Sequence, residues 1–408
     1  MRILIYCMNY SPEEVGVGKY VSEMTEWLAS RGHDLKVVTT SPHYPEWKVR
    51  NGYNSRIYSY QSKAGVGIWR CPFFVPCNPS GIKRILYMTS FIFFSFPVML
   101  WQVFWRPNVV WVVEPALICA PTALLVAKLV GAKTWLHVQD FEVDAAFDLG
   151  ILRGALIYRW VLSAEHLILR SFERVSTISR RMLMLLDKKG VSGNRSLLFL
   201  NWANLEAVIE NDASSIKLRN DLGISVGTTV ALYSGSMGAK QGLLILAGAA
   251  RLLRSEPSLK FVFCGDGVGR SELMANCVDL PNVMFLDFQP AELLGALLRM
   301  ADIHLLPQRA DVADLLMPSK LTGMLASGRP VVATAEINTE LAEVVSMCGI
   351  VVSPGDVLAF SQAIADLMAE PSRRYKLGNI GRNYAEVNFS KDNILSKFEQ
   401  DIIQLASE

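Results

Sequence analysis

The chain has 408 residues, of which 51% are hydrophobic and 19% are charged. This length exceeds what one hydrophobic core supports, so we expect two domains of similar size, and the composition excludes a disordered protein. The 40 basic and 38 acidic residues leave a net charge of +2, which gives no global field for binding nucleic acid. The seven scattered cysteines lack the spacing of a zinc site and indicate a reducing, cytoplasmic setting.

Short apolar runs separated by helical patterns follow one another along the chain. They lie at residues 2–8, 35–40, 108–115, 133–140 and 174–179, and then at 229–236, 259–267, 282–288, 301–307, 329–334 and 349–354. Continuous apolar strands of this length are typical of parallel sheets covered by helices on both faces. The sequence therefore predicts an α/β protein with two Rossmann-like, doubly wound parallel-sheet domains that face each other across a cleft.

The boundary between the domains is predicted in the polar segment 201–215, which interrupts both periodicities and is rich in Asn, Asp and Ser. The N-terminal domain would then cover residues 1–200 and the C-terminal domain 201–375. Residues 376–408 are expected to form C-terminal helices that cross back to the first domain. The run at residues 2–8 is too short for the core of a signal peptide and predicts a buried first strand.

Residues 85–105 form the most apolar window and are long enough to span a bilayer as one helix. Basic residues flank it, as at an interfacial helix: Lys83, Arg84 and Arg106. Its aromatic residues are expected to face lipid: Phe91, Phe93, Phe94, Phe96, Trp101, Phe104 and Trp105. Polar residues inside the window argue against spanning. We predict docking at an anionic membrane surface, with a plain core helix and a spanning helix as the alternatives.

Two glycine-containing loops each join a first strand to a helix. Gly16 and Gly18 stand in the first loop, and Gly235 opens the second, which includes Ser236 and Lys240. Glycines let backbone N–H groups approach a phosphate at the positive end of a helix. The first loop lacks the third glycine and the acidic residue of the dinucleotide fingerprint, so a tight structural turn is the alternative.

A third candidate anion site begins a helix at Pro318-Ser319-Lys320. A hydroxyl, a lysine and free N–H groups at one helix start attract an anion. The alternative is a helix cap with a solvated lysine. Two such loops and this helix start together suit a ligand that carries a diphosphate.

Polar residues also follow the strand predicted at 133–140. His137 stands at the strand end, where ligands bind in this class of fold, and we predict that it contacts a ligand rather than forming a satisfied core group. Asp140 and Glu142 follow on a loop and are candidates for binding a hydroxyl group, with a solvated acidic turn as the alternative. No His/Cys cluster or Asp-x-Asp pair is placed to bind a metal, so we predict none.

Several segments together carry a family resemblance. NYSPEEVGVGKY, HVQDFEVD, YSGSMGAKQGL, CGDG, ADIHLLPQ and PSKLTGMLASGRPVV, in this order and spacing, resemble family 4 of the retaining glycosyltransferases over nearly the whole chain. Within it the chain is most similar to the colanic acid branch of bacterial exopolysaccharide enzymes, whose proposed activity is fucosyl transfer. The resemblance implies a GT-B fold, a nucleoside-diphosphate sugar in the C-terminal domain, an acceptor in the N-terminal domain, and neither bound metal nor cofactor.

The resemblance also implies roles for individual residues. The expected catalytic residues are His137, at the donor sugar, and Lys240 and Lys320, at the diphosphate. The expected donor-binding residues are Gly16, Gly18, Gly235, Ser236, Gly265, Ser319 and Lys320. Asp140 and Glu142 are expected on the acceptor side. The sequence departs from the family pattern at three positions: Ser236 replaces a common arginine, Gln241 a common lysine, and Gly323 the glutamate that usually binds ribose.

The implied function is transfer of a sugar, fucose from GDP-fucose being the best match, to a lipid-linked oligosaccharide in exopolysaccharide biosynthesis. The protein would act at the inner face of the cytoplasmic membrane as a peripheral enzyme. One alternative is an inactive membrane-associated partner of polysaccharide assembly, which the missing glutamate and arginine favour. Another is a sugar-nucleotide 2-epimerase on the same fold, against which the apolar window 85–105 argues.

Overall fold

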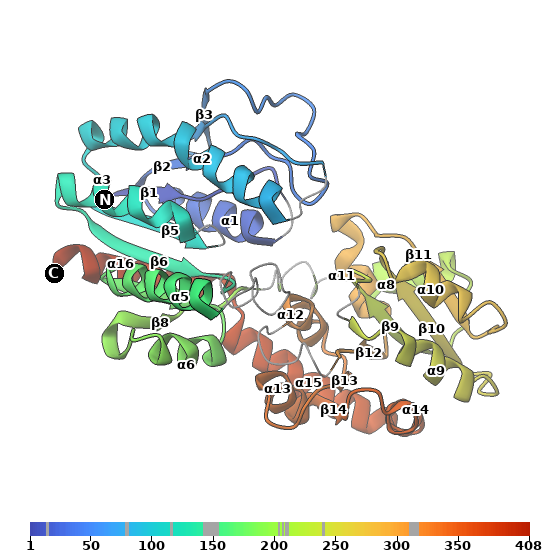
Figure 1. Ribbon diagram of the computed structural model, residues 1–408. Helices are drawn as coiled ribbons and strands as arrows, with labels where there is room; N and C mark the ends of the chain where they lie inside the picture. The colour runs from blue at the N-terminus through green and yellow to red at the C-terminus, as the bar shows by residue number, and fades with distance from the viewer. Residues whose placement is uncertain are drawn as a thin grey trace. The chain divides into compact units, whose positions relative to one another are not determined.

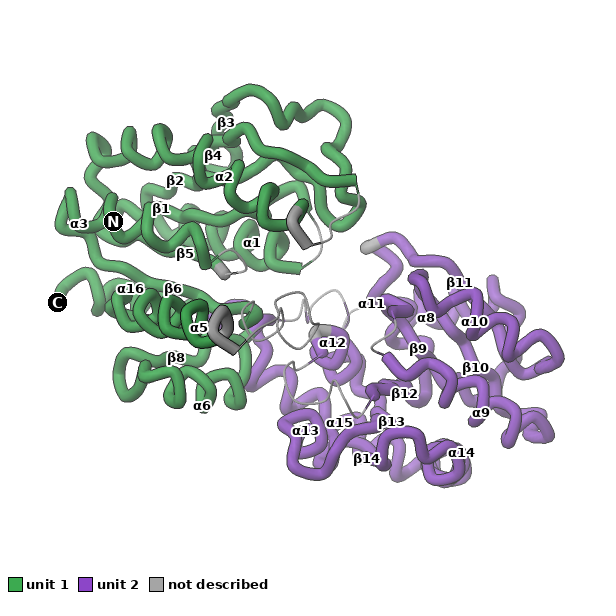
Figure 2. Tube along the Cα trace, in the orientation of Figure 1, with its two compact units in different colours: residues 1–200, 395–408 green, residues 201–394 purple. Residues whose placement is uncertain are grey.

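The computed structural model describes residues 1–13, 16–77, 81–114, 117–141, 155–202, 205, 208, 212–238, 241–309 and 318–408 (Figure 1). The chain divides into two compact units (Figure 2). Unit 1 comprises Met1–Leu200 and Leu395–Glu408, and unit 2 comprises Asn201–Ile394.

Unit 1 is built on an eight-stranded sheet of order β3-β4-β2-β1-β5-β6-β7-β8. Its strands are β1 (Arg2–Tyr6), β2 (Asp34–Thr39), β3 (Ser59–Lys63), β4 (Val66–Arg70), β5 (Val109–Glu114), β6 (Lys133–Val138), β7 (Arg174–Thr177) and β8 (Ser196–Leu198). All neighbours are parallel except β3 and β4. The sheet packs with α1 (Gly16–Ser30), α2 (Gly81–Trp101), η1 (Gln102–Trp105), η2 (Leu117–Cys119), α3 (Ala120–Val130), α5 (Ala155–Arg170), α6 (Arg180–Lys188) and η3 (Gly193–Arg195).

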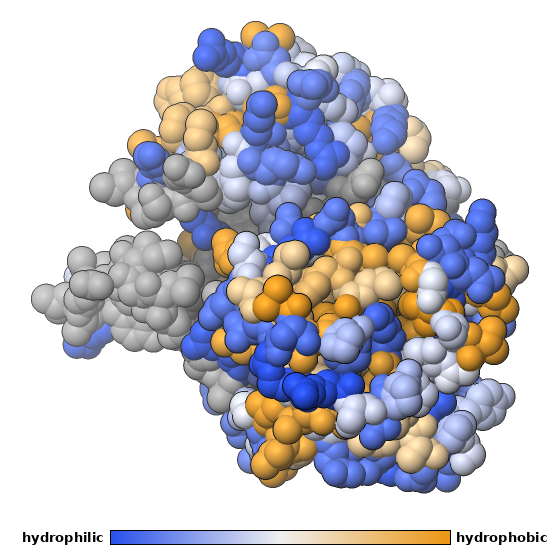
Figure 3. All heavy atoms as spheres, turned by 90° about the vertical axis from the view of Figure 1, so that its right-hand side faces the viewer, coloured by the Kyte–Doolittle hydropathy of each residue, from blue (hydrophilic) through white to orange (hydrophobic). Residues whose placement is uncertain are grey.

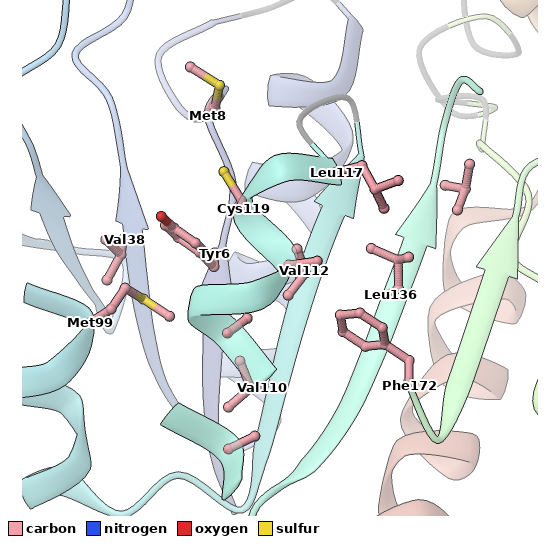
Figure 4. Packing of buried hydrophobic residues seen from close by; sticks show 14 of the residues in the cluster. Tyr6, Met8, Val38, Met99, Val110, Val112, Leu117, Cys119, Leu136 and Phe172 are labelled. Carbon is pink, nitrogen blue, oxygen red and sulfur yellow. The ribbon is translucent and has the colours of Figure 1, made fainter. Parts of the chain in front are cut away.

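The core of unit 1 forms where the central strands meet the helices. Figure 4 shows Tyr6, Val110 and Val112 on the strands beside Met99 of α2 and Cys119 at the start of α3. These side chains are buried because strands of a parallel sheet are covered on both faces, which explains their continuous apolar runs. All seven cysteines are free thiols.

The last helix, α16 (Lys391–Ser407), groups with unit 1 from Leu395 onward. Its Phe398 ring stacks on Phe199, with centroids 4.6 Å apart, and lies 5.0 Å from the ring of Trp135. Its Glu399 carboxylate lies 2.9 Å from the Nε2 atom of His33. These contacts attach the helix to the sheet and to the turn that follows α1.

Unit 2 is built on a six-stranded, all-parallel sheet of order β11-β10-β9-β12-β13-β14. Its strands are β9 (Thr229–Ser234), β10 (Leu259–Cys264), β11 (Val283–Leu286), β12 (Ile303–Leu306), β13 (Val331–Thr334) and β14 (Gly349–Val352). Its helices are α8 (Asp212–Asp221), α9 (Leu244–Leu252), α10 (Arg270–Ala275), α11 (Ala291–Met300), α12 (Ser319–Ala326), α13 (Glu340–Cys348), α14 (Val357–Ala369) and α15 (Pro371–Asn388).

Two predicted boundaries differ from the structure. Helix α8 spans Asp212–Asp221, so its first turn lies inside the segment 201–215 that we expected to be a linker, and Arg299 of α11 pairs there with the Asp212 carboxylate. Helix α15 stays in unit 2, where it packs against α12 and α13, instead of leaving with the last helix. The close contact comes from Gly378, where a Cβ atom would lie 2.0 Å from the Gly328 carbonyl oxygen.

Helix α2 has one side packed into unit 1 and one exposed side. The buried side chains recur at helical spacing: Tyr87, Phe91, Ser95, Val98 and Met99. The exposed side is also apolar and continues into η1: Ile85, Leu86, Phe93, Phe94, Phe96, Trp101 and Phe104. A helix that is apolar all round but buried on only one side leaves an exposed apolar face.

The structure corrects two of the aromatic residues that we expected to face lipid. Phe91 is completely buried, with its ring 5.4 Å from that of Tyr6. Trp105 is half-buried, and its indole N–H donates to the Asp34 carboxylate at 3.2 Å. Among the described residues, one helix, over Lys83–Trp105, is long and apolar enough to cross a membrane, by length and composition only. Figure 3 shows one face of the molecule, on which hydrophobic residues gather in patches bordered by hydrophilic ones.

Candidate functional site

Two glycine loops of unit 2 run side by side where β9 and β10 end. The Gly235 N–H donates to the Cys264 carbonyl at 3.0 Å, and the Met237 N–H donates to the Asp266 carbonyl at 2.8 Å. Gly235 and Gly265 have φ of +130° and +145°, a region that side chains rarely adopt. The glycines are therefore required for this approach of two backbones, at the sheet edge where ligands bind in such folds.

Gly265 is expected to tolerate no side chain. A Cβ atom there would lie 1.9 Å from the Gly235 carbonyl oxygen, and the φ angle adds strain of its own. We expect Gly265→Ala to lower the free energy of unfolding by about 2 kcal/mol or more, measured from urea midpoints by circular dichroism. Gly227→Ala is the control, because Gly227 has φ +89° but open space around it. Equal costs in both variants would show that the backbone approach is not what excludes a side chain.

Lys320, in the first turn of α12, reaches the Gly235 loop. Its ammonium group lies 3.1 Å from the Tyr233 hydroxyl and 4.6 Å from the centre of the Tyr233 ring. A Cβ atom on Gly235 would lie 3.4 Å from the Lys320 Nζ atom. The Tyr233 hydroxyl in turn donates to the Ser236 carbonyl at 2.5 Å. The lysine is thereby held at the end of β9.

The charge on Lys320 has no partner of opposite sign in the part of the chain that the structure describes. Burial lowers the pKa of Lys320 to about 8. A cation that has lost water without gaining a carboxylate is stabilised by an anionic ligand. Lys320 is therefore the strongest candidate anion-binding group in unit 2.

A cavity of about 830 Å³ lies at the same edge of the sheet. This size is in the range of small-molecule sites. Its lining comes from the segments that follow β9, β10, β12, β13 and β14: Gly238, Gly242, Leu243, Leu244, Ile245, Gly269, Glu272, Gln308, Arg309, Thr334, Pro354, Gly355 and Val357. Arg309 adds a second cation to this region, and a planar guanidinium suits a phosphate group.

The structure thus brings together Gly235, Ser236, Gly265 and Lys320 of the predicted donor-binding set. Ser319 begins α12 as predicted, although only its backbone is described. Lys240 lies outside the described residues. The sequence reasoning missed Tyr233, which has the pattern of a core strand residue, and Arg309. The rule that ligands bind where parallel strands end would have indicated Arg309, since it follows β12.

Two of the departures from the family pattern have structural counterparts. A Cβ atom on Gly323 would lie 3.0 Å from the end of the Leu298 side chain, so a larger residue at this position would require that side chain to move by a few tenths of an ångström. The Oε1 atom of Gln241 is buried and has no hydrogen-bond partner among the described residues. A buried acceptor left unmatched at the edge of a ligand cavity is a candidate for receiving a donor from a ligand or water.

His137 lies at the end of β6, as predicted, and is 1% exposed. Its Nε2 atom is 3.0 Å from the Gln139 amide nitrogen, which only donates, so Nδ1 carries the proton and donates to the Ser176 hydroxyl at 2.8 Å. Burial lowers the pKa of His137 to about 3, so the ring is neutral. In this structure both ring nitrogens are occupied, and a sugar contact, which stays a prediction, requires Gln139 to move.

The other candidates of unit 1 lie at the ends of its strands. Gly16 is exposed at the start of α1, and Gly18 packs 2.9 Å, measured from its Cβ position, from a carboxylate oxygen of Glu13. Asp140 is half-buried just beyond β6. Glu142 falls outside the described residues. In the described part of the chain no group of three or more His, Cys, Asp or Glu residues is placed to hold a metal ion.

Two Rossmann-like units, the second with a cavity lined by glycines, Arg309 and Glu272 where its strands end, suit a class of protein that handles phosphate-bearing ligands. Comparison with known families is consistent with this class. The model described as "Glycosyl transferase 4-like domain" matches residues 15–202, and "Glycosyl transferases group 1" matches residues 228–370.

One relative is the putative colanic acid biosynthesis glycosyl transferase WcaI of Escherichia coli K12, 40% identical over 98% of this chain and 100% of its own length. The probable glycosyltransferase WbjE of Pseudomonas aeruginosa is 28% identical over 72% of this chain and 74% of its own. The chain belongs to the group 1 glycosyltransferases and is an enzyme of that class.

Solved structures show the same fold. The sucrose-phosphate synthase of Thermosynechococcus elongatus aligns with a TM-score of 0.77 at 16% identity, over 100% of this chain and 99% of that one. The Anabaena protein HepE, in complex with UDP and glucose, aligns with a TM-score of 0.71 at 14% identity, over 99% and 100%. The predicted α/β architecture of two parallel-sheet domains, the GT-B fold, is confirmed.

Proposed function

We propose that the chain is a retaining glycosyltransferase of exopolysaccharide biosynthesis that moves a sugar from a nucleoside-diphosphate donor to a lipid-linked oligosaccharide. The 40% identity with a protein named for colanic acid biosynthesis supports the pathway. GDP-fucose is our first candidate donor. The observation that carries the proposal is the Lys320 ammonium group, half-buried beside the Gly235 loop without a carboxylate partner among the described residues.

Lys320 would act on the leaving group. As the glycosidic bond lengthens, negative charge develops on the departing diphosphate, and a preorganised cation stabilises that charge more than it stabilises the ground state. A nucleoside diphosphate is a good enough leaving group to need no proton. Retention of configuration would follow if the acceptor hydroxyl attacks from the face that the diphosphate leaves.

The test is a panel of radiolabelled sugar nucleotides incubated with the purified chain, with and without lipid-linked acceptors. We expect slow hydrolysis of one donor and faster transfer from the same donor. An isomerised sugar nucleotide would indicate a 2-epimerase, and neither product would indicate an inactive partner. In parallel, the matching nucleoside diphosphate should raise the melting temperature, because a ligand that binds only the folded state stabilises it.

Activity is expected to survive chelation of divalent metals. The charge that a metal ion supplies in other transferases would come here from Lys320 beside Gly235, and Arg309 lines the cavity at the same edge of the sheet. Transfer should therefore proceed in EDTA at a rate close to that of the untreated enzyme. A strict need for Mg²⁺ or Mn²⁺, restored on adding the ion back, would contradict this prediction.

We also propose that the exposed apolar face of α2 and η1 docks on the cytoplasmic leaflet of a membrane. Five exposed aromatic side chains on consecutive turns support this: Phe93, Phe94, Phe96, Trp101 and Phe104. Lys83, Arg84 and Arg106 are exposed at the two ends of the segment, where they suit anionic headgroups. An acceptor with a lipid anchor would be found in that leaflet.

A further inference from the structure

We infer that Tyr44 and Trp47 of unit 1 form an aromatic binding site for a sugar ring, and that the buried Glu13 carboxylate is the positioning residue that holds this site beside the start of α1. The inference rests on the proposed function in one respect, since it assigns the sugar to the acceptor. Its physical basis is independent of the cavity in unit 2.

The Glu13 carboxylate is completely buried and accepts three N–H groups. Its Oε1 atom lies 2.9 Å from the backbone nitrogen of His43 and 3.0 Å from that of Tyr44. Its Oε2 atom lies 2.9 Å from the Asn9 side-chain nitrogen. Hydrogen bonds from several N–H groups to one carboxylate are strong, so the loop at residues 43–44 is fixed to the loop that leads into α1.

The other side of the 43–47 loop is fixed as well. The His43 ring is completely buried, and its Nδ1 atom lies 2.9 Å from the Ser41 carbonyl, which only accepts, so this nitrogen carries the proton. Burial lowers the pKa of His43, so the ring is neutral and its Nε2 atom accepts from the Tyr87 hydroxyl at 2.8 Å. Tyr87 belongs to α2, so the loop is attached to that helix too.

The Tyr44 ring is left exposed by this arrangement. It is 38% exposed, and its hydroxyl makes no hydrogen bond with any residue that the structure describes. Its Cε1 atom lies 3.7 Å from the Cβ position of Gly16, at the exposed start of α1. The rigid backbone therefore presents an aromatic face that does not serve the core.

Trp47 completes the site. Its ring is half-buried and stands at 79° to that of Tyr44, with centroids 6.4 Å apart. Its φ of +51° is unusual for a bulky side chain, and such strain is concentrated at binding sites. Two aromatic rings nearly at right angles form a corner.

A sugar ring suits this corner better than an ionic ligand does. The faces of aromatic rings carry partial negative charge, which attracts the polarised C–H groups on one face of a pyranose. The Glu13 charge is already matched by N–H groups, so this carboxylate does not attract a cation. The free Tyr44 hydroxyl can donate to or accept from a sugar hydroxyl.

The experiment is saturation-transfer difference NMR on the full-length protein with a panel of methyl hexopyranosides. The nucleoside diphosphate that raises the melting temperature of the protein is added first, so that the donor site is filled. We expect at least one hexopyranoside to show a signal that falls about threefold or more in Tyr44→Ala and is kept in Tyr44→Phe, which retains the ring. Glu13→Gln should lower the signal at temperatures where circular dichroism shows a native fold, because an amide nitrogen cannot accept the N–H groups.

Tyr60→Ala is the matched control, because Tyr60 is also an exposed tyrosine of unit 1 and lies on the edge strand β3. The hexopyranoside signal measured with Tyr60→Ala should equal that measured with the unchanged protein. An unchanged signal in Tyr44→Ala, or no signal from any hexopyranoside, would overturn the inference. A saturation-transfer signal from the nucleotide that is lost in Tyr44→Ala would also overturn the inference, because the Tyr44 and Trp47 rings would then bind the nucleotide base. Failure of every nucleotide to stabilise the protein would instead count against the proposed donor.

Discussion

Replacing Lys320 with alanine is expected to slow sugar transfer by about 100-fold or more, because the charge acts on the leaving diphosphate in the transition state. The structure places this ammonium group beside Gly235, where no described carboxylate neutralises it. The measurement is single-turnover transfer from the donor identified in the sugar-nucleotide panel. Lys320→Arg, which keeps the charge but changes its geometry, should retain more activity than the alanine variant.

The pH dependence of sugar transfer should also depend on Lys320. Burial lowers the pKa of Lys320 from its ordinary value of 10.5 to about 8, so the free enzyme loses this charge as pH rises through about 8. The value of kcat/KM for the donor should therefore decrease above about pH 8 and be constant just below it. In Lys320→Arg the decrease should disappear, because arginine keeps its proton throughout this range.

Removing the Lys320 charge should change stability and activity in opposite directions. The unfolded chain holds the proton up to the ordinary pKa of 10.5, while the folded chain releases it near 8, so burying the charge costs stability at neutral pH. This cost is relieved as pH rises from about 8 to 10.5. Lys320→Met should therefore keep or raise the melting temperature of the nucleotide-free protein at pH 7 while losing transfer. A variant with near-normal turnover would remove Lys320 from the mechanism, and a large loss of stability would indicate a structural role.

The fold was predictable because parallel strands are buried on both faces and so appear as continuous apolar runs. Ten of the eleven predicted runs contain a strand of the structure, and the run at 35–40 overlaps β2, which begins one residue earlier. The strands that were missed lack this pattern. Strand β3 at the sheet edge is polar and largely exposed, and its partner β4 contains a glycine. Strand β8 has only three residues.

The candidate site was predictable only in part, because glycines and helix starts are local features but contacts between segments are not. Gly235 and Lys320 could each be identified from their own surroundings. Their contact, 85 residues apart in the chain, could not, nor could the Tyr233 ring that lies under the lysine. The partners of His137 show the same limit, since Ser176 comes from a neighbouring strand.

Glu13 shows where local reasoning fails altogether. In the sequence it stands in a polar loop next to a second glutamate, a pattern that indicates a solvated residue. In the structure its carboxylate is buried and accepts hydrogen bonds from the backbone N–H groups of residues 43 and 44. No periodicity or motif marks a backbone segment 30 residues away as the partner, so only the tertiary fold reveals its role.

Binding of the protein to anionic vesicles is expected to weaken as salt rises. The exposed face of α2 and η1 contributes apolar burial through Phe93, Trp101 and Phe104. Lys83, Arg84 and Arg106 each gain about 1 kcal/mol near an anionic leaflet, and salt screens this part. Because the other side of α2 is packed into unit 1, the helix would lie on the membrane surface instead of crossing it. Binding should therefore be reversible.

The measurement is co-sedimentation with phosphatidylserine-containing vesicles over a series of salt concentrations. Arg84→Glu should weaken binding about tenfold or more, because it removes one attraction and adds a repulsion. Lys217→Glu makes the same change of charge at an exposed lysine of α8 in unit 2 and should leave binding nearly unchanged. Phe104→Ser should weaken binding at every salt concentration, since it removes apolar burial rather than charge. Co-sedimentation that does not change with salt concentration would indicate a helix inserted across the bilayer. No co-sedimentation at all would show that this apolar face has another role.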